Sequence, residues 1–177
     1  MKKTILLIAF ILTGFATATF AQTANLNITL SDFLSFSVTQ PAELTMNFDT
    51  EAEYTNGITA LATDHISVVS SKGYTVKAIA GTITGASSLT AGSVKLTATV
   101  GTSNLGNTAD ITYGSDVVLP ASGGSAATII TAAQTSWSGA NSANKFNISY
   151  LIGANGAYAG KTIGANVIPV IYTVTQP

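Results

Sequence analysis

The amino-acid sequence predicts an all-β protein, an antiparallel Ig-like β-sandwich of about seven to ten strands. Apolar and polar residues alternate with a period of two over many short segments, which is typical of strands with one buried face. Only 8% of the residues are charged and 46% are hydrophobic, so Ser, Thr, Asn and Gly supply the polar face. This composition excludes a disordered chain and a coiled coil.

The predicted strands follow one another with turn residues between them. Their alternating segments are 24–30, 34–38, 44–48, 74–78, 94–100, 146–152 and 168–174. Turn clusters lie at 56–57, 72–73, 101–106, 122–125 and 155–156. The segment 126–134 also favours a strand, because its centre is Thr-Ile-Ile-Thr, and no helical run of useful length is found. The sequence therefore predicts one sandwich domain over 22–177.

The N-terminus has the three parts of a secretory signal peptide. Lys2 and Lys3 precede a short apolar run, and small residues follow at Thr19 and Ala21. The run is interrupted by Thr and Gly and is shorter than the roughly 20 apolar residues that cross a bilayer. We therefore expect a signal peptide over 1–21, cleavage before Gln22 and no transmembrane span in the mature chain.

Charge and cysteine content narrow the function classes. All seven basic residues are Lys, and the mature chain keeps five of them against eight acidic residues, a net charge of −3. A nucleic-acid-binding protein needs a basic surface, so this class is excluded. The chain has no Cys, whereas exported eukaryotic domains commonly carry disulfides, and this favours a bacterial origin.

The sequence offers little catalytic chemistry. His65 is the one histidine, and its neighbour Asp64 would point to the opposite face of a strand and could not orient it. We therefore predict a structural position for His65 at the start of a strand. Five of the eight acidic residues lie between Glu43 and Asp64, which leaves a glycosidase pair of carboxylates formally open. We expect a protein that is not an enzyme, with no catalytic residues and no cofactor.

One acidic segment could hold a metal ion if it were extended. Asp49, Glu51 and Glu53 would then share one face, and carboxylate oxygens suit Ca²⁺. The segment lacks the spacing of a calcium loop, so we favour a solvated loop that leads to the Asn56-Gly57 turn. We predict no metal site.

Trp137 is the best candidate for ligand contact. It lies in the polar stretch Gln134-Thr-Ser-Trp-Ser-Gly139, where an exposed ring could stack on a sugar. A core position is the alternative and is the commoner one for a Trp in a sandwich. Tyr158 is a weaker stacking candidate of the same kind, as is Tyr54.

The two ends of the mature chain are both strand-like. Leu26, Ile28 and Leu30 alternate with polar residues directly after the cleavage site, and the segment 166–177 ends the chain. Such a terminal strand either pairs within its own sandwich or completes the sheet of a neighbouring subunit. Leu26, Ile28 and Leu30 are therefore the candidate assembly residues.

The order of several strand segments resembles a known group of exported proteins. These segments are Ile-Thr-Leu (28–30), Met-Asn-Phe (46–48), Ile-Ser-Val-Val-Ser-Ser-Lys-Gly-Tyr-Thr-Val (66–76) and Tyr-Thr-Val-Thr (172–175). They resemble small pilin-like sandwich proteins, in particular spore-coat-U-like and archaic chaperone–usher subunits. Tyr74-Thr-Val76, Tyr172-Thr-Val174 and the terminal Gln-Pro are similar to WxL-domain surface proteins. The first resemblance implies a fimbria-like surface subunit, and the second implies binding to peptidoglycan.

Together these observations predict an exported, non-catalytic bacterial protein at the cell surface, outside the cell or in the periplasm. Its expected role is that of a structural or adhesive subunit, with other surface subunits or further copies of itself as partners. The alternative is a module that binds a cell-wall or host glycan.

Overall fold

The computed structural model describes residues 26–39 and 43–177. It divides the chain into two units, Met1–Ser31 and Asp32–Pro177. The predicted signal peptide (1–21), the cleavage before Gln22 and the first residues of the predicted strand 24–30 lie outside the described residues. The described strands all belong to the second unit, and the first of them begins at Leu34.

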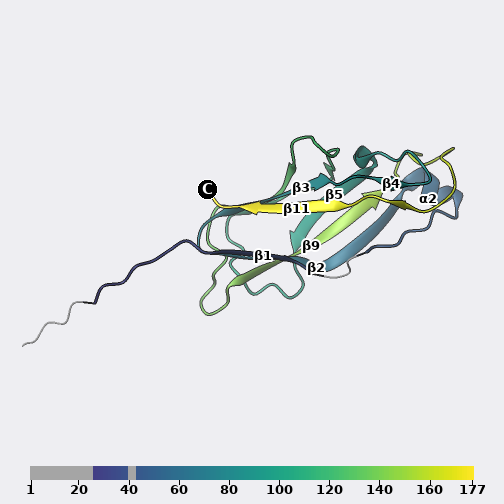
Figure 1. The fold of residues 1–177 in the computed structure, drawn as a ribbon. Helices are drawn as coiled ribbons and strands as arrows, with labels where there is room; N and C mark the ends of the chain where they lie inside the picture. The colour runs from purple at the N-terminus through teal and green to yellow at the C-terminus, as the bar shows by residue number, and fades with distance from the viewer. Residues whose placement is uncertain (1–25, 40–42) are drawn as a thin grey trace, which may run out of the picture. The chain divides into compact units, whose positions relative to one another are not determined.

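The second unit is a sandwich of antiparallel sheets, as predicted (Figure 1). The larger sheet has the order β1-β2-β9-β5-β7, the smaller has the order β11-β3-β8-β6, and β4 pairs with β10. The strands are β1 (Leu34–Val38), β2 (Ile58–Ser70), β3 (Tyr74–Ala80), β4 (Thr84–Gly85), β5 (Val94–Val100), β6 (Ile111–Tyr113), β7 (Val117–Val118), β8 (Ala127–Ala132), β9 (Ala143–Ile152), β10 (Asn166–Val167) and β11 (Val170–Thr175). A short 3₁₀ helix, η1 (Ala91–Ser93), precedes β5.

Most of the predicted strands form where the alternation placed them. β1, β3, β5, β8, β9 and β11 coincide closely with predicted segments. The segment 44–48 is an exception, because Leu44, Met46 and Phe48 are half-buried and their neighbours exposed although the segment pairs with no strand. Alternation therefore predicted which side chains face inward here, but not hydrogen bonding to a sheet.

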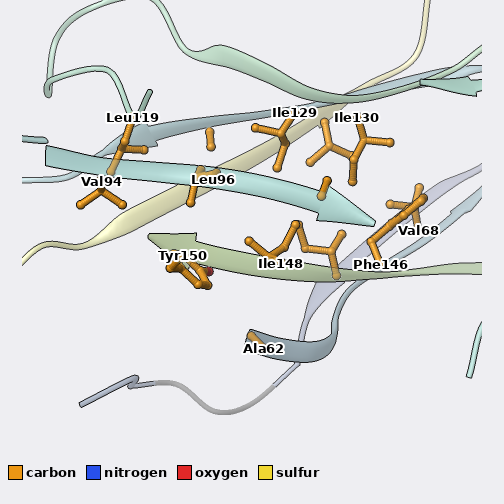
Figure 2. Close-up of a cluster of buried hydrophobic side chains, with 14 of the residues drawn as sticks. Ala62, Val68, Val94, Leu96, Leu119, Ile129, Ile130, Phe146, Ile148 and Tyr150 are labelled. Atoms are coloured by element: carbon orange, nitrogen blue, oxygen red, sulfur yellow. The ribbon is translucent and has the colours of Figure 1, made fainter. Parts of the chain in front are cut away.

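The core lies between the two large sheets (Figure 2). Inward-facing side chains of β5 and β9, such as Leu96, Phe146 and Ile148, meet Ile129 and Ile130 of β8. These five side chains are at most 1% exposed. Burying each contributes about 1.5–3 kcal/mol, so a domain without disulfides is held by this layer.

A bulge in β2 changes which residues face the core. The pairing with β9 passes from Ala62↔Ile148 to Ile66↔Phe146, so three residues of β2 oppose Asn147 alone. Asp64 has a positive φ of 49° and its N–H donates to Asn147 Oδ1 at 2.8 Å. The extra residues turn His65 inward beside Ile66, and the bulge thereby breaks the simple alternation of the strand.

One helix forms where the sequence predicted a loop. α2 (Glu51–Asn56) begins at Thr50, whose hydroxyl accepts from Glu53 N–H, while the Glu53 carboxylate accepts from Thr50 N–H at 2.8 Å. This reciprocal capping box is visible in the sequence as Thr50-x-x-Glu53. The prediction of a solvated loop is therefore wrong over Glu51–Asn56.

The described part of the first unit contains no strand. Residues 26–31 are all exposed, and Leu26, Ile28 and Leu30 are 82%, 71% and 89% exposed. The strand predicted over 24–30 is thus not formed in its described part, residues 26–30. Within the described residues, no helix has both the length and the hydropathy needed to cross a membrane.

Candidate functional site

The sandwich has two long open edges, which belong to different sheets. β1 ends the larger sheet and β11 ends the smaller one, and neither strand contains a charged residue or a proline. The opposite edges, β7 and β6, are only two and three residues long. Proteins usually protect a long edge with charge, proline or a bulge, so β1 and β11 are unusually suited to pairing with another strand.

The two open edges are joined at one end, and we call the pair of edges, β1 and β11, the seam. At one end of it, Gln176 Nε2 donates to Phe33 O at 2.8 Å and so joins the end of β11 to the start of β1. Five apolar side chains of the two strands are only partly buried against the core: Leu34, Phe36, Val170, Tyr172 and Val174. The seam therefore combines unpaired strand edges with apolar side chains that are not fully covered.

Trp137 lies on the surface, and the alternative of a core position is wrong. The side chain is 46% exposed and lines a hollow of about 450 Å³ together with Phe33, Ser35, Val69 and Ser142. Phe33 is itself 53% exposed. Sequence reasoning missed Phe33, although it breaks the alternation of the chain directly before Leu34.

The loop that carries Trp137 is anchored by the buried residue before it. Ser136 Oγ accepts from Ser70 N–H at 2.8 Å, and Ser136 N–H donates to Ser70 O at 3.0 Å. Ser136 O in turn accepts from Asn107 N–H at 2.9 Å. Because Ser136 is fully buried and bonded on several sides, the backbone holds Trp137 in place even though the ring is exposed.

Tyr158 does not share this position. Its side chain is only 8% exposed, packs edge-on against Phe48 with ring centroids 5.1 Å apart, and makes a 2.8 Å hydrogen bond with Ser93 Oγ. It therefore offers no free ring face to a sugar, and the prediction of a stacking role for Tyr158 is not supported. Tyr54 belongs to the same aromatic group, 5.5 Å from Phe48.

His65 is buried in the middle of β2, and not at the start of a strand as predicted. Its Nε2 lies 3.0 Å from Tyr150 Oη, which lies 2.5 Å from Tyr172 Oη on β11. Burial lowers the pKa of His65, and the backbone at Thr39 opposes this only in part. Asp64 points elsewhere, because its carboxylate accepts from Ser103 N–H at 3.1 Å. The two side chains do not orient each other, in agreement with the sequence argument.

This arrangement predicts that acid weakens the fold. The folded pKa of His65 lies below the unfolded value of about 6.5, so stability is full above that pH and falls as the pH drops toward the folded pKa. We expect the melting temperature to fall between about pH 7.5 and pH 5, and the His65→Gln variant to lose most of this dependence. Asp64 and Glu53 have lowered pKa values and titrate below this window. An equally steep pH dependence in the variant would contradict the assignment to His65.

The acidic segment does not form the extended face on which a metal site would depend. The capping box uses Glu53, and Asp49 N–H donates to the same carboxylate at 2.7 Å, so the three acids do not share an extended face. Among the residues that the structure describes, no three His, Cys, Asp or Glu side chains lie together as metal ligands would.

Comparison with known proteins gives no family for the chain. No protein-family model matches the sequence, and a search of curated proteins finds no match.

Proposed function

We propose that this chain is an exported, non-catalytic structural or adhesive subunit of a bacterial cell surface, and that copies join by exchanging the N-terminal strand. The observation that carries the proposal is the exposed alternation of Leu26, Ile28 and Leu30. Burying such side chains contributes about 1.5–3 kcal/mol each, so a face of this kind gains strongly from a partner. The resemblance to pilin-like subunits supports the same conclusion.

The seam is the surface that would accept this strand. β11 spans six residues and the N-terminal segment 24–30 spans seven, so the two lengths match. An incoming strand would pair with the open edge of β11 or β1 and place its apolar side chains over Leu34, Phe36 and Val174, which are only partly buried. Export is supported by the signal-peptide pattern of residues 1–21.

The non-catalytic part of the proposal is supported by the surroundings of His65. The imidazole is 6% exposed and its Nε2 is bonded to the phenol of Tyr150. It therefore lies away from the surface, where a substrate would have to reach it.

Assembly is tested by removing the strand. The chain that begins at Gln22 should form larger species as its concentration rises, as measured by light scattering. Deletion of 22–30 should abolish this growth, and the shortened chain should bind a synthetic 22–30 peptide. The control is a peptide with Leu26, Ile28 and Leu30 replaced by Ser, which keeps the length and loses the apolar face. A stable wild-type monomer at every concentration would contradict the proposal.

The alternative function, glycan binding, is favoured by one observation. Trp137 is exposed in a hollow that is also lined by the polar residues Ser35 and Ser142. Under this alternative, Trp137→Ala weakens binding to a cell-wall glycan in a pull-down without lowering the melting temperature.

A further inference from the structure

We infer that the hollow beside Trp137 is a contact surface for the next copy of this chain, namely the copy whose seam receives the N-terminal strand. This inference rests on the proposed function and adds a second contact to it. Strand exchange would then be accompanied by packing of the hollow of one subunit against the body of the other.

The first argument is the length of the connection. Asp32 forms a surface ion pair with Lys72 at 2.7 Å, and the next residue, Phe33, is held to its own sandwich by its N–H, which donates to Ser71 Oγ at 2.8 Å. Ser31 alone separates Asp32 from Leu30, the last apolar residue of the exchanged strand. Two extended residues span at most about 7 Å, so a copy that binds Leu30 must lie within that distance of Asp32.

The position of Phe33 extends this argument to the hollow. Phe33 follows Asp32 directly and lines the hollow together with Trp137. Its backbone oxygen accepts from Ser71 N–H at 2.9 Å and from Gln176 Nε2, so the residue stays with its own sandwich. The exposed aromatic surface therefore begins at the point where the neighbouring copy must approach.

The chemistry of the hollow fits a protein surface. Phe33, Val69 and Trp137 line it together with two serines, and no charged side chain does. Asp32, the residue before Phe33, is paired with Lys72. Aromatic side chains at the centre of an interface, with few charges, are typical of the residues that dominate the binding energy.

The hollow is also formed before any partner arrives. Ser136 is held by hydrogen bonds to Ser70 and Asn107, and Trp137 N–H donates to Thr135 Oγ1 at 3.2 Å. A surface that needs no ordering on binding loses less conformational entropy. This rigidity suits a contact that fixes the angle between consecutive subunits.

Trp137 is the single tryptophan, so its fluorescence reports on this contact directly. When the chain that begins at Gln22 assembles, Trp137 emission should shift to shorter wavelength and become shielded from an added quencher. Excess 22–30 peptide, added to the same chain, should fill the seam and block assembly. In that sample Trp137 emission should stay that of the monomer, because the peptide lacks Phe33 and brings no second sandwich.

A matched pair of variants measures how much the contact at the hollow contributes to assembly. Phe33→Ala should raise the concentration needed for half-assembly about tenfold and reduce the fluorescence shift. It should leave binding of the 22–30 peptide unchanged, since the seam is intact. The control is Val118→Ala, which shortens a 51% exposed side chain on β7, at the edge of the larger sheet opposite β1. It should change neither the concentration for half-assembly nor the fluorescence shift.

The outcomes separate this inference from the proposed function. Assembly with unchanged Trp137 emission would overturn the contact at the hollow and leave strand exchange standing. Absence of assembly at every concentration would overturn both. A cell-wall glycan can also be added to the monomer whose seam is filled by the 22–30 peptide. A shift of Trp137 emission in that sample would show that the hollow binds sugar and would overturn the inference.

Discussion

Phe146→Ala is expected to destabilise the domain by about 3–5 kcal/mol, whereas Trp137→Ala should cost less than about 1 kcal/mol. Phe146 is 1% exposed in the centre of β9 and packs against the rings of Tyr74 and Tyr113, with centroids 6.5 and 6.2 Å away. Its removal leaves a cavity between the sheets. Chemical denaturation of both variants measures the difference in the free energy of unfolding.

A third variant provides the control for this comparison. Val100 pairs with Phe146 across the strands β5 and β9, yet its side chain is 46% exposed. Val100→Ala should therefore change the free energy of unfolding by only about 0.5 kcal/mol. A loss on Trp137→Ala as large as that of Phe146→Ala would show that Trp137 is a core residue after all.

Gly57→Ala is expected to destabilise the domain by roughly 3–5 kcal/mol. Gly57 ends α2 with φ 78° and ψ 177°, a conformation open essentially to glycine alone. An added Cβ would also lie 2.5 Å from Ile152 O and 2.7 Å from Ala154 N, and both are backbone atoms that cannot rotate away. At position 57, backbone strain and steric overlap of the added Cβ therefore both contribute to the loss of stability.

Substitutions at two other glycines separate the effect of backbone strain from that of steric overlap. Gly156 has φ 69° but open space around the position of a Cβ, so its replacement by Ala should cost about 1 kcal/mol through strain alone. Gly92 has neither restriction, since the nearest atom is Val118 Cγ1 at 4.0 Å, and Gly92→Ala should be close to neutral. Thermal melts of the three variants should give this order, and a mild effect at position 57 would refute the backbone geometry described for it.

Much of the fold could be predicted because alternation and burial have the same cause. In β9, every second residue from Asn144 to Tyr150 faces the core, and the sequence alternates accordingly. Prediction failed where another interaction decided the local structure. The capping box of Thr50 and Glu53 formed a helix, and the bulge at Asp64 turned His65 inward; the first is readable from spacing, but the second depends on Asn147, which is distant in sequence.

The candidate site was harder to predict because it is built by contacts between distant segments. Leu26, Ile28 and Leu30 could be selected from their alternation alone, and whether they pair in assembly is still a prediction. The hollow joins Phe33 to Trp137, which no local pattern connects. Tyr158 and Trp137 are both aromatic residues in polar stretches, and contacts with the distant residues Phe48 and Ser93 bury Tyr158 while Trp137 stays exposed.

The unequal edges of the sandwich have a consequence for any assembly built from it. Under the proposed strand exchange, each copy gives one N-terminal segment and receives one at its seam, because the edges at β6 and β7 are too short to serve as a second acceptor. Head-to-tail exchange of this kind that does not close into a ring or a reciprocal dimer continues as an unbranched, polar filament. The two tips of that filament differ chemically: the copy at one tip has an unfilled seam, and the copy at the other has an unused strand. Growth can therefore be stopped at one tip by a strand that fills the seam, and at the other tip by a molecule that binds the unused strand.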